Sequence, residues 1–355
     1  MSSYSILGLM SGTSMDGLDI AHVTFNLLES EEWEYTVNHT ETYSYDLQTL
    51  QQLRAGKTLS TLQVLELDKH LGLLFANHIN TFLKKNNISK DTINAIASHG
   101  HTIHHRPDIG FTQQIGCGDT IAYKTGIKVI NDFRQKDVVA GGQGAPLVPI
   151  GDQLLFSKKA DAFLNIGGFV NICIPSERTV AFDICPGNLP LNEAVNELEL
   201  DYDNKGYLSS TGTLNEDILH QLNTLEYYNE LRSKSLGTEW LESVFTPIAK
   251  QIPAPKDRLR TITEHLAIQI SKSINQLKIT KLYITGGGAF NDFLIHRIKA
   301  HTTSELIIPD VTTINYKEAI VFAFLGVRFL RCEINCLSSV TGAQKDTVGG
   351  SLHYS

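Results

Sequence analysis

The sequence predicts a mixed α/β protein built from two similar halves. Near the N-terminus an apolar run enters a turn of Gly, Ser, Thr and Asp, and a second apolar run leaves it. Residues 162–174 repeat this organisation around Gly167 and Gly168, which suggests two like-built halves facing one nucleotide. Apolar residues recur at helical spacing over residues 47–82 and 258–277. A chain of 355 residues is long enough for two domains or one large α/β domain.

Composition and charge argue against several classes of protein. The chain is 42% hydrophobic and 19% charged, as expected of a globular protein with a sizeable core. The formal charge of −8 argues against a nucleic-acid partner. No apolar stretch reaches membrane-spanning length, so we expect no membrane partner and a cytoplasmic address. The five cysteines form no CxxC pair and are typical of reduced thiols.

The first glycine-rich turn, residues 12–19, is the first candidate ligand site. Its glycines allow backbone N–H groups to approach an anion, and Thr13 and Ser14 add hydroxyl donors. Asp16 and Asp19 would repel a phosphate unless they hold a metal ion or its waters. No Lys follows Gly17, and a strand comes next, so the turn is not a Walker A motif. A polar hairpin turn without a ligand is the alternative interpretation.

Two segments before the middle of the chain carry polar residues at a strand end. Residues 93–105 indicate a strand that runs into a histidine-rich loop with no acidic residue, which favours hydrogen bonding over metal binding. Residues 126–134 indicate a strand that ends in charged residues, which puts Asp132 and Arg134 at the usual position of a site in an open α/β sheet. A surface ion pair is the alternative for either residue. The Gly/Pro-rich residues 140–149 indicate a domain junction or a loop against a ligand.

The second half offers two carboxylates and a run of glycines. Asp183 ends an apolar strand and is costly to bury unless it is hydrogen-bonded or acts as a general base; capping the next turn is the alternative. Gly286 to Gly288 separate a strand from a helix, where backbone can lie against a base or a phosphate. Glu318 lies near the start of the last long helix, where it also suits the helix dipole.

Together these segments resemble the anhydro-N-acetylmuramic acid kinases, sugar kinases of the actin/hexokinase/Hsp70-like ATPase superfamily. The resemblance covers nearly the whole chain and includes residues 12–19, 98–102, 132–134, 141–149, 165–171, 183–188, 234–239, 286–291, 318–319 and 341–343. The chain departs from the family pattern at Ile184 and Cys185, where Thr and Gly are usual. It also departs at Asn192, where Asp is common, and at His101, where Gln is usual.

The resemblance implies an actin-like, ribonuclease H-like α/β fold of two domains with an active-site cleft between them. Residues 1–131, joined by 340–355, would form the N-terminal domain and residues 132–339 the C-terminal domain. The implied activity is ATP-dependent hydrolytic opening of the 1,6-anhydro ring of anhydro-N-acetylmuramic acid with phosphorylation of O6. The product is N-acetylmuramic acid 6-phosphate, an intermediate of cell-wall recycling.

The resemblance also implies roles for individual residues. Asp183 would be the base and Glu318 its partner at the sugar, and Asp16 would lie near Mg²⁺. The expected nucleotide-binding residues are Gly12, Thr13, Ser14, Met15, Asp16, Gly17, Leu18, Asp19, Gly167, Gly168, Gly286, Gly287, Gly288 and Asn291. The expected sugar-binding residues are His99, Thr102, Arg134 and Asn188. Another sugar kinase of the superfamily, an actin-like ATPase and a binding module without catalysis are the alternatives, and a homodimer is left open.

Overall fold

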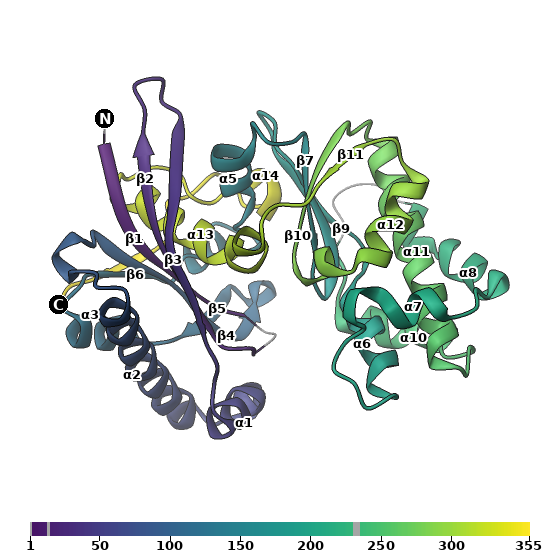
Figure 1. Cartoon of the computed structure of the whole chain (residues 1–355). Coiled ribbons are helices and arrows are strands. Elements are labelled where there is room, and N and C mark those ends of the chain that lie inside the picture. The colour runs from purple at the N-terminus through teal and green to yellow at the C-terminus, as the bar shows by residue number, and fades with distance from the viewer. Residues whose placement is uncertain (1, 13–14, 230–234) are drawn as a thin grey trace. The chain divides into compact units, whose positions relative to one another are not determined.

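The computed structural model describes residues 2–12, 15–229 and 235–355. It contains two β-sheets with helices packed against them, which confirms the predicted α/β class. The chain divides into two compact units, shown in Figure 1. Unit 1 comprises Met1–Leu155 and Tyr316–Ser355, and unit 2 comprises Phe156–Asn315.

The elements of unit 1 come from both ends of the chain. Its strands are β1 (Ser2–Ser11), β2 (Leu18–Leu27), β3 (Trp33–Tyr43), β4 (Ala95–Arg106), β5 (Phe111–Ile115), β6 (Val129–Asn131) and β12 (Ser351–His353). Its helices are α1 (Leu47–Ala55), α2 (Thr61–Lys85), α3 (Gly118–Thr125), α4 (Gln135–Val139), α5 (Pro149–Gly151), α14 (Ser338–Thr341) and most of α13 (Val311–Leu330).

The elements of unit 2 are contiguous in the sequence. Its strands are β7 (Ala162–Ile166), β8 (Phe169–Ile174), β9 (Val180–Pro186), β10 (Lys281–Thr285) and β11 (Glu305–Ile307). Its helices are α6 (Asn188–Asn196), α7 (Tyr207–Thr211), α8 (Glu216–Asn223), α9 (Thr238–Trp240), α10 (Thr246–Ala249), α11 (Pro255–Gln276) and α12 (Asp292–His301).

The sheet of unit 1 has the strand order β12-β6-β4-β1-β2-β3, with β5 paired to β4. β1 and β2 form the predicted antiparallel hairpin, whereas β1 and β4 are parallel and are therefore joined by a long crossover that contains α2. Leu7 and Leu9 face the core beneath α2, while Gly8 faces α13. A Cβ atom at Gly8 would overlap the main-chain oxygen of Ala319, so α13 rests directly on the backbone of β1.

One local expectation is wrong. The histidine-rich residues 99–105 belong to β4, and from His101 onward they pair with β5, where a loop was expected. The pairing satisfies the backbone groups of that segment, because Phe111–Ile115 runs back antiparallel to it. The ring of His99 lies 4.6 Å from that of Phe322 on α13, and Nδ1 of His101 lies 2.9 Å from Oγ of Ser11 at the end of β1.

The sheet of unit 2 has the order β11-β10-β7-β8-β9. β7 and β8 form the second predicted hairpin around Gly167 and Gly168, and β10 is parallel to β7 and β11. The long helix α11 begins with Pro255 at its first turn and buries Leu259, Ile262, Leu266 and Ile270 in the core of this unit.

The division between the units falls at other residues than 131 and 340. Unit 1 continues to Leu155, and it takes up the chain again at Tyr316, within α13. Packing accounts for this. A Cβ at Gly151 would lie 2.6 Å from a methyl group of Val321, and one at Gly326 would lie 2.7 Å from Cβ of Ala97. α5 and α13 are therefore packed together on the first sheet.

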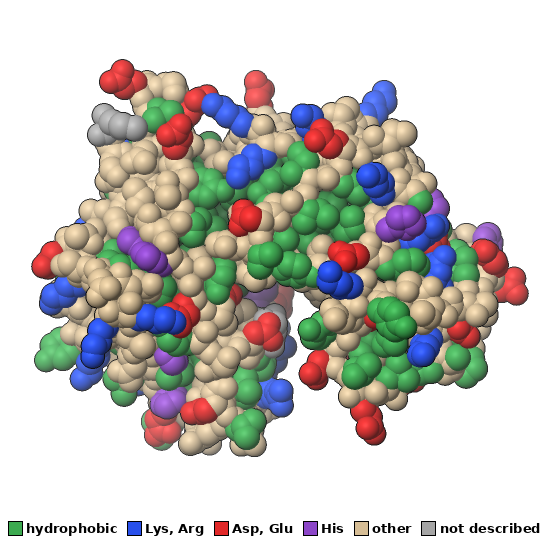
Figure 2. Space-filling model, in the orientation of Figure 1, with side chains coloured by type: hydrophobic (Ala, Val, Ile, Leu, Met, Phe, Trp, Pro, Cys, Tyr) green, Lys and Arg blue, Asp and Glu red, His purple; other side chains and the backbone are tan. Residues whose placement is uncertain are grey.

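Figure 2 shows how charged side chains are distributed on one face of the molecule. On the face shown in Figure 2, Lys and Arg side chains are interspersed with Asp and Glu and do not gather into a basic stripe. Among the described residues, no helix is both long and apolar enough to cross a membrane.

Candidate active site

The first glycine-rich turn connects β1 to β2 at one end of the sheet of unit 1. The last pair of the ladder, Met10 with Asp19, brings the two ends of the turn together. Met15 donates its N–H to the carbonyl of Gly12 (3.1 Å) and has a φ of 62°, and Gly17 packs against the backbone of Tyr43. This turn is therefore tightly folded on both sides of Thr13 and Ser14, which lie outside the described residues.

Carboxylates gather beside this turn in unit 1. Burial raises the pKa of Asp19 to about 6, a hydroxyl bond from Thr42 (2.6 Å) opposes that shift, and the negative charges of Glu318 and Asp16 add to it. Asp16 itself is exposed. Among the described residues, no three His, Cys, Asp or Glu side chains form a metal-binding group. Mg²⁺ usually takes one or two carboxylates with water and phosphate oxygens, so these residues fit the ion.

Arg134 is held by His99 on the α13 face of the sheet. Nε and Nη2 of Arg134 both donate to Nε2 of His99 (3.0 and 2.9 Å), and Nη1 donates to the carbonyl of Gly144 (2.7 Å). Nδ1 of His99 lies 2.9 Å from the carbonyl of Gly100, which can only accept, so Nδ1 carries the proton and the ring is neutral. Burial and the charge of Arg134 lower the pKa of His99 well below its usual range, as this arrangement requires.

Glu318 belongs to the same neighbourhood. Loss of solvation raises the pKa of Glu318, and the positive charges of Arg134 and Lys317 oppose the rise. Lys317 forms a buried ion pair with Asp152 (2.7 Å), which ties α13 to the segment that follows α5. A carboxylate with a raised pKa beside an arginine is typical of functional sites, although structural ion pairs also shift pKa values.

The remaining predicted residues of β4 take part in polar contacts within unit 1. Thr102 accepts a hydrogen bond from the amide of Gln114 on β5 (3.3 Å). His101 lies 2.9 Å from Oγ of Ser11, which accepts a hydrogen bond from the hydroxyl of Tyr45 (2.7 Å). This chain of contacts fixes the last residue of β1, immediately before Gly12.

Asp183 lies on β9 in unit 2, where the ladder has an irregularity. Val170 pairs with Cys185 and the next residue, Asn171, pairs with Asp183, so Ile184 is an extra residue in β9. Such a bulge bends a strand and re-aims its side chains. Oδ2 of Asp183 accepts the N–H of Leu236 (2.8 Å) and the hydroxyl of Ser235 (3.2 Å). Since both partners lie far along the chain, the carboxylate does not cap the turn after it.

The protonation of Asp183 reflects this partly buried setting. Burial raises the pKa of Asp183, and the bonds from Leu236 and Ser235 oppose that rise. The main-chain oxygen of Asp183 accepts a hydrogen bond from the hydroxyl of Tyr227 (2.7 Å). The side chain and the main chain of Asp183 are therefore each fixed by a separate segment.

The glycine turns of unit 2 lie against one another. The N–H groups of Gly187 and Asn188 donate to the carbonyls of Gly168 and Gly167 (both 2.8 Å). A Cβ at Gly286, whose φ is 84°, would lie 2.7 Å from the carbonyl oxygen of Ile166, and a Cβ at Gly287 would lie 3.6 Å from the side-chain amide of Asn188. The structure therefore brings Gly167, Gly168, Asn188 and the Gly286 to Gly288 run together.

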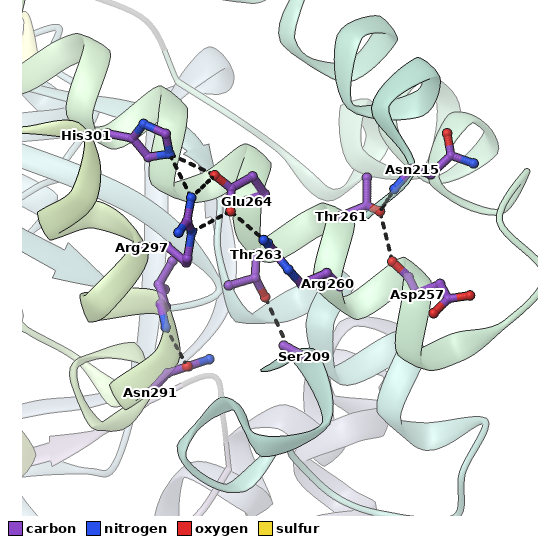
Figure 3. Close-up of polar contacts among 11 residues, drawn as sticks. Ser209, Asn215, Asp257, Arg260, Thr261, Thr263, Glu264, Asn291, Arg297 and His301 are labelled. Carbon is purple, nitrogen blue, oxygen red and sulfur yellow. Dashed lines mark hydrogen bonds and ion pairs between the residues drawn. The ribbon is translucent and has the colours of Figure 1, made fainter. Parts of the chain in front are cut away.

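Asn291 serves the helix that follows these glycines. Its side-chain oxygen accepts the N–H of Leu294 (2.9 Å) and caps α12, as Figure 3 shows. α12 is anchored to α11 by Glu264, which accepts from Arg260 (2.7 Å), Arg297 (2.7 and 2.8 Å) and His301 (2.7 Å). Burial alone would raise the pKa of Glu264, but these donors hold it at about 2. Nucleotide binding by Asn291 stays a prediction.

Each unit thus assembles its own part of the predicted set. Unit 1 brings together Asp19, His99, Arg134 and Glu318, and unit 2 brings together Asp183, Asn188 and the glycine turns. Sequence reasoning missed Ser235 and Tyr227 as partners of Asp183. Ser235 belongs to residues 234–239 of the family pattern, and its separation of 52 residues from Asp183 along the chain leaves no local signal of their contact. The interdomain cleft stays a prediction.

Comparison with known proteins adds the family. The profile of the anhydro-N-acetylmuramic acid kinase family matches residues 4–355. The chain is 38% identical to the anhydro-N-acetylmuramic acid kinase of Shewanella oneidensis over 369 residues, covering 97% of each chain. It is 36% identical to that of Shewanella sediminis over 374 residues, covering 99% of each.

Solved structures resemble the chain more remotely. The activator of the 2-hydroxyisocaproyl-CoA dehydratase from Clostridium difficile with bound ADPNP is 13% identical, over 92% of this chain and 97% of the other, with a TM-score of 0.44. A likeness of this degree carries no conclusion about function.

The chain has two α/β units with glycine turns and carboxylates at their strand ends. Together with the family match and the Shewanella kinases, these features define a sugar kinase. The family match covers the chain almost from end to end, and the relatives match over nearly their full lengths. The chain belongs to the anhydro-N-acetylmuramic acid kinase family.

Proposed function

We propose that the protein uses ATP and water to convert 1,6-anhydro-N-acetylmuramic acid into N-acetylmuramic acid 6-phosphate, a step of cell-wall recycling. The proposal rests chiefly on Asp183, a partly buried carboxylate whose pKa is raised and whose side chain is fixed by Ser235 and Leu236. A cytoplasmic address belongs to the same proposal, because ATP is supplied there.

The reaction joins two bond exchanges. A water oxygen bonds to the anomeric carbon while the bond from that carbon to O6 breaks, and O6 takes the γ-phosphoryl group as its bond to the β-phosphate oxygen breaks. Asp183 accepts the proton that the water loses and later releases it to solvent. A carboxylate that activates water in this way is what inverting glycosidases use. A raised pKa suits the role, since a general base works best when its pKa approaches the working pH.

Arg134 is proposed to bind the lactyl carboxylate of the sugar. His99 takes the edge of the guanidinium that carries Nε and Nη2, and Gly144 takes one proton of Nη1. Nη1 and Nη2 each keep one further proton beyond these contacts, and the edge between these two nitrogens is the one proposed to face the sugar. A carboxylate can pair with such an edge through two parallel hydrogen bonds. His99 then orients the arginine instead of contacting the sugar itself.

The phosphate groups are proposed to lie against the glycine turns. Phosphoryl transfer needs positioning and charge stabilisation more than covalent help from the protein. The turn of residues 12–19 and the Gly167-Gly168 turn would offer N–H donors, and the Gly286 to Gly288 run would contact the adenosine. Asp16, with Asp19 near it, would hold Mg²⁺ or its waters. The ion supplies positive charge that neutralises the phosphates when it is bound.

The test is an assay for a phosphorylated reducing sugar. The protein is incubated with Mg·ATP and anhydro-N-acetylmuramic acid, and we expect equal amounts of ADP and the reducing 6-phosphate. Asp183→Asn should abolish turnover and spare ATP binding, whereas Asp201→Asn, at an exposed turn position, should have full activity. ADP without sugar phosphate would indicate an ATPase, and phosphate on an ordinary hexose would indicate another sugar kinase. Retained turnover in Asp183→Asn would contradict the assignment of the base.

A further inference from the structure

The two oxygens of the Asp183 carboxylate have different surroundings. Both donors, the N–H of Leu236 and the hydroxyl of Ser235, bond to Oδ2. Within residues 2–12, 15–229 and 235–355, no donor bonds to Oδ1. An unrestrained Asp side chain rotates broadly about its terminal torsion, and the two oxygens exchange roles when it does. Two donors on one oxygen remove that exchange.

Hydrogen bonds to one oxygen also decide where a proton is held. A lone pair that already accepts a hydrogen bond is less available to a proton, and both donors together stabilise the charged carboxylate. The protonatable lone pairs are therefore those of Oδ1. The hydroxyl of Tyr227 donates to the main-chain oxygen of Asp183 and not to its carboxylate.

The backbone around Asp183 also helps to give Oδ1 and Oδ2 different roles. The bulge at Ile184 sets the direction of the Asp183 side chain from within β9. The donors come from the segment just before α9, which lies more than 50 residues further along the chain. β9 restrains the Asp183 side chain at its backbone, and the segment of Ser235 and Leu236 restrains it at Oδ2. The position of Oδ1 therefore depends on both segments.

We propose that Ser235 is a positioning residue for the reaction: with the N–H of Leu236 it holds Oδ2 of Asp183, so that Oδ1 is the atom that takes the proton from the attacking water. The inference rests on the proposed role of Asp183 as the base. Ser235 touches neither the sugar nor the nucleotide in this assignment and acts through Asp183. The Leu236 N–H, which a substitution at Ser235 leaves in place, supplies the remaining restraint.

The test compares Ser235→Ala with Ser235→Thr, which keeps the hydroxyl. We expect Ser235→Ala to lower kcat about tenfold, the usual size for one lost hydrogen bond to a charged group. The acidic limb of its pH profile for kcat/KM should move to higher pH, because the charged carboxylate loses a donor. KM for ATP should stay unchanged. Ser235→Thr should restore both kcat and the position of the limb.

Two controls separate this inference from the proposed function. Ser243→Ala removes an exposed hydroxyl that donates to the carbonyl of Glu239, and it should match the unmodified protein in rate and pH profile. Asp183→Asn tests the base directly. If Asp183→Asn keeps its activity, the proposed base is wrong whatever Ser235 does. If Asp183→Asn is inactive but Ser235→Ala keeps the original kcat and acidic limb, or Ser235→Thr is as impaired as Ser235→Ala, only the role of Ser235 is overturned.

Discussion

Replacing Glu264 by Gln should destabilise the protein by about 3 kcal/mol. The carboxylate receives hydrogen bonds from Arg260, Arg297 and His301, which hold its pKa at about 2 instead of 4.5 (Figure 3). Each unit of pKa difference corresponds to about 1.4 kcal/mol, so the difference corresponds to about 3 kcal/mol. The side chain of Glu264 is only 5% exposed, so solvent screens these contacts little.

The sign of the pH dependence follows from the lowered pKa. The folded protein binds this proton less readily than the unfolded chain, so the stabilisation is complete above about pH 4.5 and is lost as the pH falls toward 2. The loss should loosen α12, which begins directly after Asn291. We therefore also expect KM for ATP to rise in Glu264→Gln if the Gly286 to Gly288 run contacts the adenosine.

Urea unfolding at pH 7 measures the effect. Glu305→Gln is the matched control, because Glu305 pairs with Lys281 at 3.6 Å with both side chains more than half exposed. An exposed pair of this kind contributes about 0–1 kcal/mol, so the control should unfold nearly as the unmodified protein does. A loss below about 1 kcal/mol in Glu264→Gln, no larger than in the control, would refute the reasoning from the pKa and the burial of Glu264.

Two further pH-dependent effects should be measurable. His265 bonds to Tyr228 and Asn223, and burial lowers its pKa to about 3, so the folded state loses stability as the pH falls below 6.5. From pH 7 to 5 this residue alone should cost about 2 kcal/mol in urea unfolding, and His265→Asn should remove that slope; an unchanged slope would contradict the assignment. Burial raises the pKa of Asp19 from 3.8 to about 6, so the fold loses stability as the pH rises from about 3.8 to about 6. Asp19→Asn should raise the urea midpoint at pH 7 but not at pH 4, and an equal rise at both values would disprove this origin.

The sequence predicted those parts of the fold that depend on local pattern. Alternating apolar residues on either side of a glycine turn indicate a hairpin, and both predicted hairpins form. The pattern of three glycines between a strand and a helix is also local in the sequence, and β10 and α12 flank the glycines as expected. The strand nature of residues 99–105 was not local, because it depends on pairing with Phe111–Ile115.

The sequence indicated which residues belong to the candidate site better than it indicated which of them contact one another. Arg134 and His99 were each expected to bind the sugar, whereas the structure shows His99 bonded to Arg134. Asp183 stood out as a carboxylate among apolar residues, but Ser235 and the bulge at Ile184 depend on chain segments that only the fold brings together. Side chains that act through another residue leave no pattern of their own in a single sequence.

The neutral ring of His99 has a consequence for how the protein responds to acidity. A histidine whose two nitrogens are both committed, one donating to Gly100 and one accepting from Arg134, has no lone pair left for a proton. The guanidinium and the imidazole together therefore carry one positive charge across the whole physiological range. Recognition of an anionic group by Arg134 should then be constant where an ordinary histidine site would weaken or strengthen with each pH unit.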